Sequence, residues 1–125
     1  MLSHQLYNVV HIVGIVLLAS ALGGAAVYGM AGLPPESSRV RRLLAVLHGL
    51  GAFLILLGGF GMLARLGVMH GAGFPGWVWV KLVVWAVLAV ALLAPYRRPA
   101  LAKPMLFALP ILGGLAAYMA IYKPI

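Results

Sequence analysis

The sequence contains no cysteine and only one carboxylate side chain, that of Glu36. The absence of cysteine excludes disulfides, iron–sulfur clusters and thiol catalysis. A single acid excludes paired-carboxylate hydrolysis, aspartate proton relays and carboxylate-rich metal sites. Charged residues of any kind make up only 8% of the chain. Any chemistry therefore depends on His, Lys, Arg, Tyr, Trp or backbone groups.

Apolar residues are abundant, at 65% of the 125 residues, and the mean hydropathy is +1.12. A water-soluble chain of this length buries only about two-thirds of its unfolded surface, so its exterior would be largely apolar. A lipid environment removes that difficulty. The net charge of +8 does not indicate a nucleic-acid partner, because the basic residues lie beside apolar segments. We expect the lipid bilayer, through anionic headgroups, to supply the counter-charge.

Long apolar runs separated by short loops predict an all-α fold, a four-helix transmembrane bundle that forms one integral membrane domain over residues 1–125. Each run approaches the roughly 20 residues that a helix needs to cross about 30 Å of hydrocarbon. Open strands would leave backbone groups unpaired in lipid, and a barrel would show short alternating segments. We place the helices near residues 5–30, 43–66, 77–95 and 105–122, with a last loop from Pro95 to Pro104.

The basic residues predict the orientation of the chain. The first and third loops hold six Lys and Arg residues, whereas the opposite side holds two. Cytoplasmic loops collect Lys and Arg, so we expect these two loops in the cytoplasm and both termini on the non-cytoplasmic side. The six are Arg39, Arg41, Arg42, Arg97, Arg98 and Lys103, and the two are Arg65 and Lys123.

Three ionisable residues fall well inside the predicted helices, where they are costly and therefore candidates for function: His11, His48 and Lys81. The first and third helices both run inward, so we expect His11 and Lys81 at a similar depth, roughly 6 to 10 Å below the outer surface. The second helix starts at the cytoplasmic side, so we expect His48 about 10 to 15 Å from His11 along the membrane normal. This separation disfavours one haem held between the two histidines.

Each of these residues also has a purely structural interpretation. Lys81 can extend its amine to the outer headgroups. His11 can hydrogen-bond to a neighbouring helix, and we expect His48 to bond a backbone carbonyl that Pro110 frees in the fourth helix.

Two short stretches surround His11 and Lys81. They are residues 10–16, Val-His-Ile-Val-Gly-Ile-Val, and residues 77–82, Trp-Val-Trp-Val-Lys-Leu. They resemble the HemJ-type protoporphyrinogen oxidases, which are four-helix bacterial membrane proteins, and more loosely the copper-resistance D-type relatives of that family. The resemblance implies that His11 and Lys81 are the functional pair associated with b-type haem and porphyrinogen oxidation. It also implies a bacterial inner (cytoplasmic) membrane.

The leading hypothesis is a membrane redox protein that binds haem b or handles a porphyrin and passes electrons to a quinone or another membrane carrier. By the resemblance, His11 ligates the haem iron. Lys81 is the catalytic residue and either the second ligand or a charge partner, and His48 is the next candidate for cofactor binding.

The alternative hypothesis is a non-catalytic structural or assembly subunit of a larger membrane complex. The small size, the glycine-rich helices and the scarcity of polar groups favour it. The sequence leaves open whether the chain forms a homo-oligomer. A small transporter ranks last, because no carboxylate or repeat marks a midplane substrate site.

Overall fold

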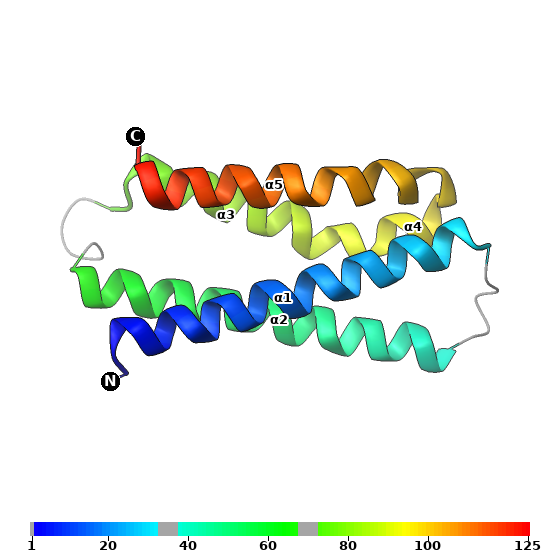
Figure 1. The fold of residues 1–125 in the computed structure, drawn as a ribbon, viewed down its shortest axis with the longest axis horizontal. Coiled ribbons are helices and arrows are strands. Elements are labelled where there is room, and N and C mark those ends of the chain that lie inside the picture. Colours follow the sequence, from blue (N-terminus) through cyan, green and yellow to red (C-terminus); the bar gives the residue numbers. More distant parts are fainter. Residues whose placement is uncertain (1, 33–37, 68–72) are drawn as a thin grey trace.

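A computed structural model describes residues 2–32, 38–67 and 73–125, so Glu36 lies outside the described residues. Within these ranges the chain is helical and contains no strand (Figure 1), which confirms the all-α prediction. Four helical stretches of the described residues are long and apolar enough to span a membrane. They cover His4–Met30, Arg39–Leu66, Gly76–Arg97 and Pro99–Tyr122.

The first two helices are α1 (His4–Met30) and α2 (Ser38–Leu66). α1 begins where the Ser3 side-chain oxygen accepts a hydrogen bond of 3.1 Å from the Leu6 amide, a typical N-cap. The predicted start of the second helix at residue 43 was wrong by five residues. Arg39, Arg41 and Arg42 belong to the first turns of α2 rather than to a loop, because arginine is a good helix former and its chain can reach a polar boundary.

The third and fourth spans contain α3 (Gly76–Val90), η1 (Ala91–Leu93), α4 (Ala94–Arg97), η2 (Pro99–Leu101) and α5 (Ala102–Tyr122). The predicted loop from Pro95 to Pro104 was therefore wrong, since only Arg98 in it is non-helical. Proline fits the first turn of a helix, where its missing amide is not needed. The chain tightens into η1 just before Pro95, and the Ala94 amide bonds the Ala91 carbonyl.

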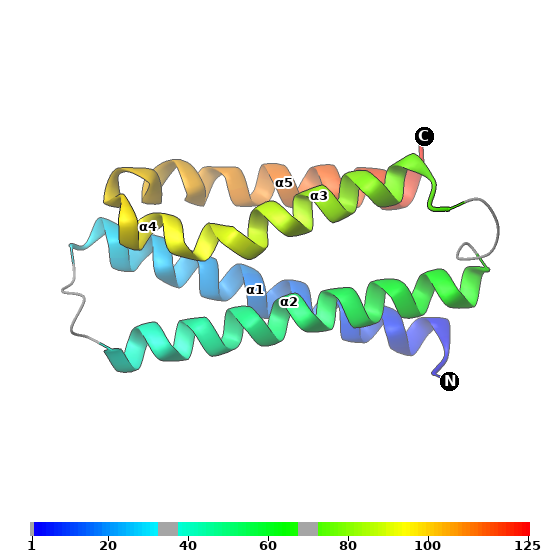
Figure 2. The same ribbon diagram turned by 180° about the vertical axis from the view of Figure 1, so that it is seen from behind.

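The helices form two antiparallel pairs (Figures 1 and 2), with α1 beside α2 and α3 beside α5. The two termini lie at the same end of the bundle, and α4 packs against α1 at the other end. α1 and α2 make the most extensive contact of the fold.

Three glycines allow the backbones of α1 and α2 to touch. A Cβ atom added to Gly14, Gly51 or Gly58 would lie 2.7, 2.6 or 2.5 Å from a backbone nitrogen of the facing helix. Any side chain at these positions would push the helices apart. Such close approach through small residues is how helices associate when lipid surrounds them.

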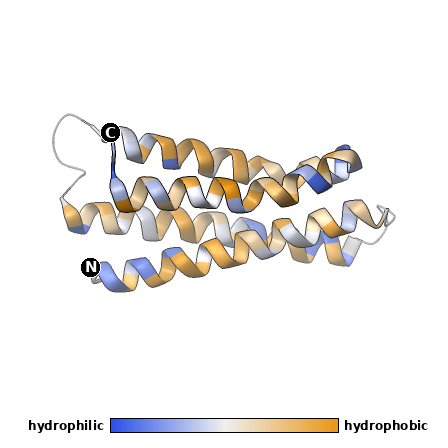
Figure 3. Ribbon diagram, turned by 45° about the horizontal axis from the view of Figure 1, so that its top comes forward, coloured by the Kyte–Doolittle hydropathy of each residue, from blue (hydrophilic) through white to orange (hydrophobic). Residues whose placement is uncertain are grey.

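The apolar interior consists of two clusters. The larger contains Leu18, Leu22, Ala52 and Leu92 among others, and the smaller contains Leu63, Trp77 and Val78. Figure 3 shows hydrophobic residues along the length of the helices and hydrophilic ones mainly towards the two ends of the bundle. This distribution is the one expected of helices that cross a bilayer.

Candidate functional site

His11 lies on α1 and points its ring towards α2. Its Nδ1 atom lies 2.8 Å from the backbone carbonyl oxygen of Ile55. A carbonyl oxygen only accepts, so Nδ1 carries the proton and donates it. The neutral ring then keeps its lone pair on Nε2. Gly59 leaves space for the ring, because a Cβ atom there would lie 3.4 Å from the Cε1 atom of His11.

His48 has a different environment. It is buried, with 7% of its surface exposed, and its Nε2 atom donates to the carbonyl oxygen of Leu88 at 3.0 Å. The expectation that its partner lies on the fourth helix was wrong, because Leu88 belongs to α3. The Nε2 proton is thus committed to joining α2 to α3.

Trp85 completes a reciprocal connection between these two helices. Its indole Nε1 donates to the carbonyl oxygen of Ala52 on α2 at 3.0 Å. Each helix therefore gives one side-chain donor to a backbone carbonyl of the other. Sequence reasoning did not assign a hydrogen-bonding role to Trp85, although its spacing of four from Lys81 and eight from Trp77 placed all three on one helical stripe.

These hydrogen bonds fix the level of Lys81 along the bundle. The paired levels are Trp85 with Ala52, and α2 and α3 run in opposite directions. Lys81 lies about 6 Å beyond Trp85 by helix rise, and Ile55 lies about 4.5 Å beyond Ala52 in the same direction. Lys81 is therefore nearly level with Ile55 and with the His11 ring that bonds it.

Lys81 is half-buried, and its positive charge acts on His11. Within the described part of the chain, no hydrogen bond joins the Lys81 amine to another residue. The structure thus brings His11 and Lys81 to one level without linking them directly. Space between two such groups is what a shared ligand requires.

This polar level separates the two apolar clusters. On α2, Ile55 lies between Ala52 of the larger cluster and Leu63 of the smaller one. On α3, Lys81 lies between Val78 of the smaller cluster and Leu92 of the larger one. The change in core composition at this level distinguishes it from the rest of the bundle.

His48 does not join this group. It precedes Ile55 by seven residues on α2, which is about 10 Å of helix rise. Among the described residues there is no cluster of three or more His, Cys, Asp or Glu side chains that could hold a metal ion. A haem iron needs only one or two axial ligands from the protein, so the fit of a haem depends on His11 and Lys81.

Comparison with protein-family models, with curated proteins and with solved structures gives no match. The functional argument therefore rests on the residues of the chain itself.

Proposed function

We propose that this protein is a multi-pass membrane redox protein that binds b-type haem and oxidises a porphyrinogen. In this proposal His11 ligates the haem iron, and Lys81 is either the second ligand or a partner for the porphyrin carboxylates. The chain lies in a bacterial inner membrane with both termini on the non-cytoplasmic side.

The observation that carries the proposal is the hydrogen bond between His11 and Ile55. Metal-ligating histidines almost always donate the other ring N–H to a carbonyl or carboxylate, which fixes the tautomer and the ring orientation. His11 has this arrangement, with Nδ1 held at 2.8 Å by a carbonyl and Nε2 left for a ligand. The donor chemistry of the residues present therefore fits a haem.

The remaining roles follow from the chemistry of the two side chains. A bound haem would supply one-electron redox chemistry, and electrons would leave to a quinone or another membrane carrier. Lys81 has no carboxylate partner among the described residues, so its charge is available to an anionic ligand. The apolar clusters above and below exclude water from the level between them.

A visible spectrum of the wild-type protein, expressed with an ample haem supply, tests the proposal. We expect a Soret band that persists through purification. Lys81→Ala should shift this spectrum or lower the activity while the protein remains folded, whereas Lys123→Ala at the end of α5 should leave both unchanged. A folded wild-type protein with no Soret absorbance would overturn the proposal.

The orientation has a separate test. Reporters fused after Lys123 should be active only outside the cytoplasm, because six of the eight loop Lys and Arg residues lie at the opposite end of the bundle. Cytoplasmic activity of a stable fusion would reverse the orientation and leave the haem proposal untouched.

One observation favours the alternative, a structural or assembly subunit of a larger membrane complex. His11, His48 and Trp85 all bond backbone carbonyls of neighbouring helices, as residues that only hold a bundle together would. α5 is also the least buried of the four candidate spans, so it has surface to offer a partner. A stable, colourless protein that purifies with other membrane subunits would support this alternative.

A further inference from the structure

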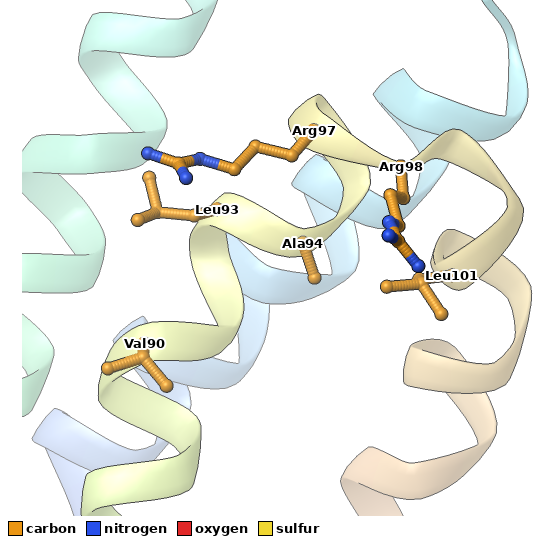
Figure 4. A pocket seen from close by; sticks show the side chains of 6 residues that line it. All are labelled: Val90, Leu93, Ala94, Arg97, Arg98 and Leu101. Carbon is orange, nitrogen blue, oxygen red and sulfur yellow. The ribbon is translucent and has the colours of Figure 1, made fainter.

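A shallow pocket lies where α3, η1, α4 and η2 meet, at the end of the bundle away from the termini. Its volume is about 350 Å³, and Val90, Leu93, Ala94, Arg97, Arg98 and Leu101 line it (Figure 4). Its lining combines two cations with four apolar side chains. No role proposed above uses these residues.

The position of Arg98 follows from the local sequence. Pro99 disfavours the helical conformation for the residue before it, and Arg98 is extended, with φ −136° and ψ 92°. The Arg98 amide bonds the Ala94 carbonyl at 2.9 Å, and the Leu101 amide bonds the Arg98 carbonyl at 2.9 Å. The backbone of Arg98 is thus fixed on both sides of the break between α4 and η2.

The two guanidinium groups flank the pocket from opposite sides. Figure 4 shows the Arg97 side chain reaching past Leu93 and the Arg98 side chain turned towards Leu101, with Ala94 between them. Both arginines are exposed, and neither has a hydrogen bond, ion pair or ring contact within the described ranges. Arg41 at the same end differs, because its guanidinium lies 4.1 Å from the ring centroid of Tyr96.

The charge of this end calls for an anion. It carries six Lys and Arg residues, and the whole chain has one carboxylate side chain, so pairing with Glu36 leaves at least five of these cations unmatched. The apolar part of the lining is exposed as well, at 68% for Val90, 50% for Leu93 and 43% for Leu101. A ligand that suits both features has an anionic group joined to a hydrocarbon chain.

We propose that this pocket binds one anionic phospholipid. The phosphate lies between Arg97 and Arg98, and an acyl chain runs along Val90 and Leu93 towards the middle of the bundle. A volume of about 350 Å³ accommodates a phosphate with its glycerol but not the chains, which follow the exposed face of α3. The site rests on insertion of the chain in a membrane and is independent of the proposed haem.

Native mass spectrometry of the full chain in a neutral detergent tests the proposal. Phosphatidylglycerol should bind in a ratio of one to one, and phosphatidylcholine should not. The double variant Arg97→Gln, Arg98→Gln should weaken the binding of phosphatidylglycerol about 20-fold, because each basic side chain beside an anionic headgroup contributes about fivefold. Val90→Ala with Leu93→Ala should weaken it less.

The matched control removes the same charge from the same end of the bundle. Arg39 and Arg42 are exposed on α2 and do not line the pocket. The double variant Arg39→Gln, Arg42→Gln should bind phosphatidylglycerol as the wild type does. Equal losses in the two double variants would overturn the proposal, because the attraction would then come from general charge. Competition by inorganic phosphate as strong as that by the lipid would also overturn it, because the site would then take free phosphate.

Discussion

His11 and His48 make the same kind of hydrogen bond at two levels of the bundle, but with different ring nitrogens. His11 uses Nδ1 to bond Ile55, at 2.8 Å, and remains half-buried. His48 uses Nε2 to bond Leu88, at 3.0 Å, and only 7% of its surface is exposed. The neutral His11 ring therefore offers its outer nitrogen, Nε2, to a ligand. The neutral His48 ring has only Nδ1, the nitrogen next to its own backbone.

The two levels also differ in what surrounds each histidine. His48 lies near the Trp85 and Ala52 hydrogen bond and beside the larger apolar cluster. His11 lies against Gly58 and Gly59 and is nearly level with Lys81. One level is closed by side-chain hydrogen bonds between α2 and α3, and the other contains a cation without a hydrogen-bond partner in the described part of the chain. We infer that the first maintains the bundle and the second binds a ligand.

The strongest way to break the His11 level is Gly58→Ala. The added Cβ would lie 2.5 Å from the His11 backbone nitrogen, so α1 and α2 must separate. We expect a loss of about 1 to 3 kcal/mol in the free energy of unfolding, as overpacking typically costs. Unfolding in mixed micelles with increasing dodecyl sulfate measures this change.

Gly49→Ala on the same helix is the matched control for Gly58→Ala. Nothing lies within 4 Å of a Cβ at Gly49, so this change should leave the free energy of unfolding nearly the same or raise it slightly. Equal stability of the two variants would contradict the close contact between α1 and α2.

A smaller effect should follow from opening the His48 level. Trp85→Phe keeps an aromatic ring and removes the donor to Ala52, which should lower the free energy of unfolding by about 0.5 to 1.5 kcal/mol. The same unfolding assay measures it, and Trp79→Phe on the exposed face of α3 is the control. If the two variants lose the same amount, the Trp85 hydrogen bond does not stabilise the bundle.

The smallest effect is expected outside both levels, at Glu36. The sequence places this acid in a proline- and serine-rich segment near three arginines, where a solvated ion pair contributes at most about 1 kcal/mol. Glu36→Gln should leave haem content and activity close to those of the wild type. A large loss of either would show that the first loop contributes to the His11 level.

Much of the fold followed from the sequence, because long apolar runs have one solution in lipid. The shared level of His11 and Lys81 followed from helix direction alone. The last loop was mispredicted because Pro95 and Pro104 sit in first turns, where proline is tolerated. The partner of His48 was also missed, because the register between α2 and α3 depends on their packing rather than on the sequence of either helix.

The most direct test of the difference between the two histidines is the haem content of two matched variants. His11→Ala and His48→Ala are expressed with the same ample haem supply, and the Soret absorbance per protein is measured after purification. The account predicts that His11→Ala loses most of the bound haem, because the iron loses its nitrogen ligand, while His48→Ala retains it at a lower stability. Retention of haem by His11→Ala together with its loss from His48→Ala would contradict the account and assign the ligand to the His48 level.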